Sequence, residues 1–124
     1  PAALARMLQQ AKDASQRFAA EAKATVTWQR LWHIAPAPFH PDLIAFCDQA
    51  ILETTGTTYR LPSGPLHDAA EVAITGIPTI MMFVQSLHGI SHNKIEDTRE
   101  DHLEQALTAF DRLASKIMAW IAAR

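Results

Sequence analysis

The spacing of apolar residues predicts four helices in this chain. Within residues 4–22, apolar side chains recur every three or four positions with polar ones between them, which is typical of an amphipathic helix. A second helix is expected over residues 41–56, because it opens on a proline and closes at a glycine. A short helix is expected over residues 67–75. The last and longest helix follows Thr98, which together with Asp101 resembles a capping box.

Other stretches have the pattern of β-strands. Residues 24–34 alternate between apolar and polar side chains and are rich in β-branched and aromatic types, which predicts a strand with one wet face. A short strand is expected over residues 57–61. Residues 77–85 form an almost unbroken apolar run, as expected of a strand covered on both faces. From residue 41 onward the order is α-β-α-β-α, which predicts an α/β fold with a helix-flanked, mostly parallel sheet.

The stretch "APAPFHPD", residues 35–42, divides the chain. Three prolines in so short a span exclude a helix or a central strand, so we place a domain boundary there. Residues 1–35 then hold one helix and one strand, which cannot close a core of their own. We therefore expect residues 1–35 to be the end of one domain and residues 36–124 to be a sizeable piece of another.

Composition narrows the functional classes. A formal net charge of −2, without a run of Lys or Arg, gives no basic field for nucleic acid, so polynucleotide binding is not expected. No window approaches the roughly 18 apolar residues of a membrane span, and a cytoplasmic setting is the default expectation. The single cysteine, Cys47, falls on the apolar side of a helical pattern and is expected to be a buried thiol.

Two loops carry histidine beside acidic residues. His67 and Asp68 follow the short predicted strand, and His92 follows the long one, with Glu96 and Asp97 close behind. In open parallel sheets, ligands bind outside the carboxyl ends of strands, where both loops are expected. Histidine is the commonest metal ligand and the usual proton shuttle near neutral pH. From the residues alone, His92 is either an incidental loop histidine or a ligand held at the edge of a sheet.

The chain by itself does not offer a whole catalytic site. A catalytic zinc needs three protein ligands, and a two-metal site needs more. The sequence has no HxH or HExxH pair, no Glu-Glu doublet, no GxSxG elbow and no phosphate-binding glycine loop. The residues therefore provide about half of a metal site.

Three motifs in fixed order resemble a known family. They are "SGPLHDA" at residues 63–69, "GIPT" at residues 76–79 and "GISHNKIEDT" at residues 89–98. Over residues 57–115 the chain resembles the C-terminal end of the zinc-dependent amidases that cleave N-carbamoyl groups. These are the N-carbamoyl-L-amino acid hydrolases, β-ureidopropionases of the β-alanine synthase type and allantoate amidohydrolases, a branch of the M20 metallopeptidase superfamily.

The resemblance implies a role for several residues. His92 would ligate one of two divalent metal ions, and Glu96 would act behind it as an acceptor for the other ring nitrogen. The following residues would line the cleft and contact or shape the substrate: Ser63, Gly64, His67, Asp68, Gly89 and Ser91. The family pattern is not complete, because Pro65-Leu66 stands where the family has Ala-Gly, and Lys94-Ile95 where it has Pro-Ala.

The resemblance also implies partners and cofactors. The full-length enzyme would hold two Zn or Mn ions and act on a small ureido or N-carbamoyl compound, with at most one metal ligand from this chain. The general base and the remaining ligands would lie upstream, so we expect a C-terminal fragment, a proteolytic product or a split gene. Residues 1–35 would end the lid domain that mediates homodimer formation. The 124 residues alone are expected to be inactive.

Two alternatives remain open at this point. An M20 peptidase or aminoacylase fragment would share the same metal site, and the carbamoyl branch is preferred because of the Ser-Gly-x-x-His-Asp loop beginning at Ser63. A non-catalytic α/β interaction module is the other alternative, since an unpaired strand in residues 24–34 would invite edge-to-edge pairing.

Overall fold

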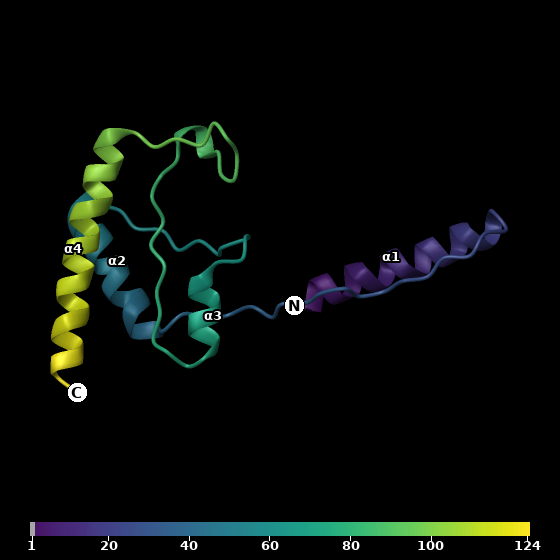
Figure 1. Cartoon of the computed structure of the whole chain (residues 1–124), viewed down its shortest axis with the longest axis horizontal. Helices are drawn as coiled ribbons and strands as arrows, with labels where there is room; N and C mark the ends of the chain where they lie inside the picture. Colours follow the sequence, from purple (N-terminus) through teal and green to yellow (C-terminus); the bar gives the residue numbers. More distant parts are fainter. Residues whose placement is uncertain (1) are drawn as a thin grey trace. The chain divides into compact units, whose positions relative to one another are not determined.

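A computed structural model describes residues 2–124 and divides the chain into two compact units, Pro1–Pro36 and Ala37–Arg124. Within residues 2–124 the regular structure consists of four α-helices and one short 3-10 turn, with no β-strand (Figure 1). None of the helices in this range is long and apolar enough to cross a membrane. The lid and catalytic assignments of the two parts of the chain stay predictions.

The first unit consists of a helix and an irregular segment that runs back beside it. Helix α1, Ala2–Glu21, confirms the first predicted helix, and the residues after it run back along its length (Figure 1). The indole Nε1 of Trp28 donates a hydrogen bond of 2.8 Å to Oγ of Ser15, which fastens the two together. The strand predicted over residues 24–34 is wrong, because this segment lies beside a helix and has no partner strand among the described residues.

The second unit contains the other helices. They are α2 (Pro41–Thr55), α3 (Asp68–Ile74), the 3-10 turn η1 (Leu87–Gly89) and α4 (Glu100–Ala122). The three helices predicted in this part of the chain are confirmed. Proline opens α2 as expected, and Nδ1 of His40 caps it by accepting a hydrogen bond of 3.3 Å from the backbone N–H of Asp42.

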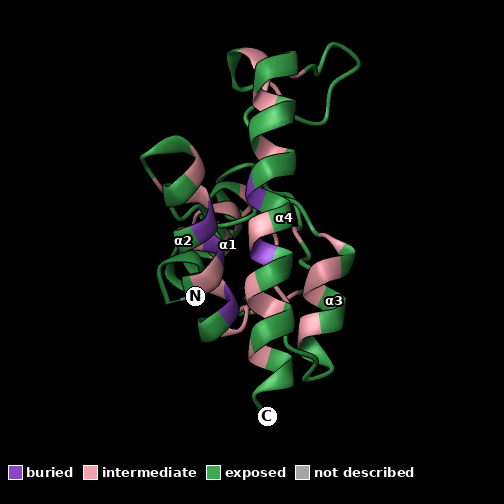
Figure 2. Ribbon diagram, turned by 90° about the vertical axis from the view of Figure 1, so that its left-hand side faces the viewer, coloured by how far each residue is buried: buried purple, intermediate pink, exposed green. Residues whose placement is uncertain are grey.

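A small core lies where α2 and α4 face each other. The side chains that are almost fully buried are Leu43, Cys47 and Ala50 of α2 and Ala109 and Leu113 of α4. Figure 2 shows these buried positions along the facing sides of the two helices, while most of the remaining surface is exposed or intermediate. Because so few side chains are buried, the stability of this unit depends heavily on the contact between α2 and α4.

Polar contacts at the edge of the α2–α4 pair contribute less to stability than the apolar core does. Nη1 of Arg112 donates a hydrogen bond of 2.8 Å to Oγ1 of Thr54, and Nζ of Lys116 lies 2.9 Å from a carboxylate oxygen of Glu53. The ion pair is partly exposed, so solvent screens it, and we expect a contribution of about 0–1 kcal/mol. Apolar packing therefore contributes most to holding the two helices together.

The predicted α/β fold is contradicted, because the structure of residues 2–124 is helical and has no sheet. The strands expected over residues 57–61 and 77–85 have no regular structure (Figure 1). A strand is defined by a ladder of backbone hydrogen bonds to a neighbour. In the part that the structure describes, residues 77–85 make one backbone bond, from the N–H of His40 to the carbonyl of Thr79 at 3.1 Å. The side chains suit a strand, but the ladder of backbone hydrogen bonds does not form among the described residues.

The start of α4 also differs from the prediction. The residue that caps it is Arg99, which makes no side-chain capping bond. The carboxylate of Asp101 accepts two hydrogen bonds from the guanidinium of Arg99, at 2.8 and 2.6 Å, and this contact lowers the pKa of Asp101. The backbone N–H of Thr98 donates to the carboxylate of Asp97. The predicted capping box is wrong, because the carboxylate of Asp101 is bound by Arg99 and the backbone N–H of Thr98 is bound by Asp97.

The end of α2 gives a test of backbone strain. Gly56 has φ of +78°, a left-handed conformation, and no atom lies within 4 Å of the Cβ that alanine would add. The Gly56→Ala variant should therefore lose about 1 kcal/mol of unfolding free energy from the backbone alone. Gly64→Ala is the matched control, since that glycine is not left-handed and has equal space. Thermal unfolding followed by circular dichroism measures both, and equal stabilities would contradict the argument.

Candidate functional site

The loop between η1 and α4 holds the histidine that the sequence singled out. Its two ends are joined by a backbone hydrogen bond of 2.8 Å from the N–H of Leu87 to the carbonyl of Asp97. Inside the loop, the side-chain oxygen of Asn93 accepts from the N–H of Ile95 at 3.2 Å, and its carbonyl accepts from the N–H of Glu96 at 2.9 Å. The loop is therefore shaped by its own hydrogen bonds rather than by a neighbouring sheet.

His92 itself has an unusual backbone. Its φ is +57°, in the left-handed region that few residues other than glycine adopt. Its backbone N–H donates a hydrogen bond of 2.7 Å to Oε2 of Glu96. The carboxylate thus fixes the backbone of His92. The family resemblance had instead implied that it accepts a hydrogen bond from a ring nitrogen of His92. A residue held in such a conformation by its surroundings is often found at a binding site.

The two histidine loops meet. The rings of His67 and His92 have centroids 6.3 Å apart with an angle of 64° between their planes. His67 occupies the residue before α3, yet its side chain makes no capping hydrogen bond, so the imidazole remains available. His92 is exposed and His67 is half-buried. The structure therefore brings these two predicted residues together, even though the sheet that was expected to do so is absent from residues 2–124.

The other predicted residues lie around this pair in the sequence. The hydroxyl of Ser63 donates to the carbonyl of Pro65 at 2.8 Å, which stabilises the turn before α3. Gly89 has φ of +69°, a conformation that suits glycine. The candidates that are exposed to solvent are Ser63, Gly64, Asp68, Gly89, Ser91 and Glu96. Their roles in substrate binding stay predictions.

A complete metal site is not formed by these residues. Within residues 2–124 no group of three or more His, Cys, Asp or Glu side chains is arranged to hold a metal ion. The two imidazoles are donors of the right type for zinc or manganese, but a catalytic metal needs at least three protein ligands. The donor set therefore fits part of a metal site and leaves the rest to be supplied by other residues.

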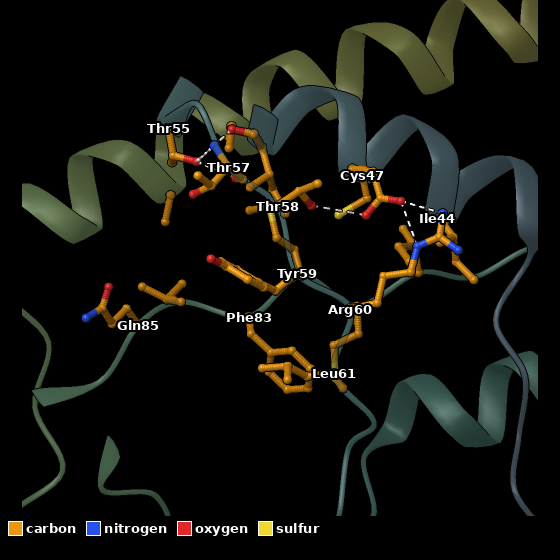
Figure 3. Close-up of a pocket in the computed structure, with 18 of the residues that line it drawn as sticks. Ile44, Cys47, Thr55, Thr57, Thr58, Tyr59, Arg60, Leu61, Phe83 and Gln85 are labelled. Carbon is orange, nitrogen blue, oxygen red and sulfur yellow. Dashed lines mark hydrogen bonds and ion pairs between the residues drawn. The ribbon is translucent and has the colours of Figure 1, made fainter. Parts of the chain in front are cut away.

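The structure also shows a groove that the sequence did not reveal. It has a volume of about 570 Å³ and is lined by residues of α2, of the first half of α4, and of the segments 57–61 and 80–85 (Figure 3). Ser63 lies at its margin, so the groove and the histidine loops are neighbours along the chain. The sequence motifs point to polar groups at strand ends, whereas most of the side chains that line this groove are apolar.

Cys47 lines the groove and gives a test of its burial. The side chain is 6% exposed, and burial, with a smaller effect of the nearby Asp48 charge, raises the pKa of its thiol. We expect the midpoint of its alkylation by iodoacetamide, followed by intact mass between about pH 7 and pH 11, to lie higher than in concentrated guanidinium.

The sign of this shift also sets a pH dependence of stability. Folding raises the pKa of the Cys47 thiol. Its contribution to the free energy of unfolding is therefore fully present below the thiol pKa of the unfolded chain, and it is lost as the pH rises through the thiol pKa of the folded chain. The Cys47→Ala variant, which cannot be alkylated, should lack this loss at alkaline pH. Equal alkylation midpoints for folded and unfolded protein would contradict the shift.

The comparisons with known proteins cover the same region. Residues 4–116 match the model of peptidase family M20/M25/M40. The chain belongs to this family. It is 34% identical over 73 residues to allantoate amidohydrolase of Escherichia coli (strain K12), a match that spans 58% of this chain. No solved structure matches it.

The M20 chain is short beside that relative, since the match spans only 17% of the amidohydrolase. The family resemblance noted in the motifs of residues 63–98 is thus confirmed at the level of M20 membership. The activity and substrate of the whole protein are therefore proposals.

Proposed function

We propose that this chain supplies His92 to the two-metal site of an M20 amidohydrolase that cleaves the C–N bond of N-carbamoyl amino acids or related ureido compounds. The observation that carries this proposal is the approach of His67 and His92 to 6.3 Å, inside the region that matches the family. The similarity to allantoate amidohydrolase favours an amidohydrolase over a peptidase or aminoacylase. The substrate would be a small molecule, because the neighbouring groups are single imidazoles, hydroxyls and glycines.

The roles of the residues follow from their positions. His92 would hold one Zn or Mn ion, Glu96 keeps the backbone of His92 in its left-handed conformation, and His67 would hydrogen-bond to the substrate. A bound divalent metal polarises the carbonyl of the bond to be cleaved. The second metal, the remaining ligands and the general base would come from polypeptide beyond these 124 residues. Residues 1–35 would take part in a homodimer.

A chimera tests this role. The segment of Escherichia coli allantoate amidohydrolase that corresponds to residues 57–115 of this chain, which include His92, is replaced by those residues. We expect the chimera to bind zinc or manganese and hydrolyse allantoate. Introducing His92→Ala into it should lower kcat/KM by more than about 100-fold, since even outer-shell partners of a metal ligand contribute 10- to 100-fold.

His88→Ala is the matched control for this experiment. His88 lies four residues earlier, in the 3-10 turn η1, is exposed and has the same φ of +57°, so the two substitutions disturb the backbone alike. The His88 variant should keep its metal content and most of its activity. A metal-loaded, active chimera that tolerates His92→Ala as well as His88→Ala would exclude the proposed ligand.

A further inference from the structure

Asn93 follows His92 in the loop and lies at the start of a tight turn. Its side-chain Oδ1 accepts a hydrogen bond of 3.2 Å from the N–H of Ile95, and its backbone carbonyl accepts one of 2.9 Å from the N–H of Glu96. Asparagine often bonds to the backbone two residues later, and such a bond closes a turn. Residues 93–96 therefore fold back on themselves.

This turn brings the side chain of Glu96 to His92. Oε2 of Glu96 accepts a hydrogen bond of 2.7 Å from the backbone N–H of His92, four residues earlier in the chain. Four residues of extended chain would span about 13 Å, which is farther than a glutamate side chain can reach. The bond to His92 therefore forms only when residues 93–96 are turned.

The bond to Glu96 holds His92 in a conformation that residues with a side chain rarely adopt. The φ of His92 is +57°, where its Cβ crowds the following carbonyl oxygen. A hydrogen bond to a carboxylate is stronger than one to a neutral acceptor, so it can offset this crowding. Backbone conformation also decides which side-chain rotamers are allowed. If φ relaxed to a negative value, the ring of His92 would leave its place 6.3 Å from the ring of His67.

We infer that Asn93 is a positioning residue for the imidazole of His92. Its side-chain oxygen closes the turn, the turn places Glu96, and Glu96 fixes the backbone of His92. Because that oxygen is engaged by Ile95, Asn93 acts through its neighbours and not on a metal or substrate. The inference rests on the proposed function where it makes the positioned imidazole a metal donor, while the positioning itself concerns this loop alone.

Nuclear magnetic resonance on the 124-residue chain tests the positioning without a metal. In the unsubstituted chain we expect a nuclear Overhauser contact between the ring protons of His67 and His92. Asn93→Ala removes the acceptor for Ile95, so this contact should fade and exchange of the His92 amide proton should become at least about threefold faster. Asn93→Asp keeps the acceptor and should retain both properties. Lys94→Ala, a change at the next residue, which is exposed, is the matched control and should also retain them.

The chimera described above tests the consequence for the metal. Introducing Asn93→Ala there should weaken the affinity for Zn²⁺ at least about 10-fold, as the loss of a residue that orients a metal ligand does, whereas Lys94→Ala should leave it within about twofold. Thermal unfolding of each variant is measured as well. A merely structural role would lower the melting temperature and leave the zinc affinity of the folded protein unchanged.

Each outcome decides the role of Asn93. Loss of the ring contact and of zinc affinity in Asn93→Ala, with the contact kept in Asn93→Asp, supports the inference. A ring contact that survives Asn93→Ala, or that is missing from the unsubstituted chain, overturns it. Unchanged zinc affinity of the Asn93→Ala chimera also overturns it when His92→Ala abolishes binding. If His92→Ala leaves zinc affinity unchanged, the proposed function fails instead, and the ring contact alone decides whether Asn93 positions the imidazole.

Discussion

The 124-residue chain on its own is expected to hydrolyse neither allantoate nor N-carbamoyl amino acids, with or without added Zn²⁺ or Mn²⁺. Within residues 2–124 at most two imidazoles converge, and no third His, Cys, Asp or Glu side chain joins them. Two imidazoles cannot retain a catalytic metal, which needs three or more protein ligands. Release of ammonia or of free amino acid, measured over hours, gives the test.

The positive control is Escherichia coli allantoate amidohydrolase under the same conditions. Turnover by the pure chain would contradict the expectation only if it disappeared in the His92→Ala variant, since a contaminating hydrolase would not respond to that change.

Replacing Leu113 by alanine should cost about 2–5 kcal/mol, which is a large part of the stability of a small domain. Leu113 is 3% exposed and lies in the core cluster with Cys47 and Ala50 of α2. Few other side chains are buried here, so the cavity cannot be filled by a neighbouring layer. Denaturant unfolding followed by circular dichroism should show an early or non-cooperative transition.

The matched control lies on the same helix. Leu107 is 71% exposed, so Leu107→Ala makes the same chemical change without opening a cavity and should shift stability by no more than about 0.5 kcal/mol. Equal losses for the two variants would mean that the exposed face of α4 is covered in solution, for instance by a second copy.

Helices were predictable because their hydrogen bonds close within the segment itself. The proline before Asp42 and the glycine at position 56 set the ends of α2 from local chemistry alone. The strands were not predictable in the same way, because a ladder needs a neighbour distant in sequence. Residues 57–61 and 80–85 have strand-like side chains, yet within residues 2–124, residues 58–61 and 80–85 form no backbone–backbone hydrogen bonds.

The candidate site was predicted through the wrong architecture. The motifs placed His67 and His92 at the edge of a sheet; in the structure their ring centroids lie 6.3 Å apart without that sheet. The left-handed backbone of His92 and its bond to Glu96 depend on the fold of the loop and cannot be derived from residue types. The groove was missed because most of the side chains that line it are apolar, and no motif marks such a surface.

The bond from Leu87 to Asp97 has a practical consequence. Because it joins the ends of the loop, residues 87–97 can be synthesised as a macrocycle in which a covalent link replaces that single contact. Such a cyclic peptide would present the imidazole of His92 without the helices. Its affinity for zinc, compared with that of the linear peptide, measures how far ring closure alone prepares the donor.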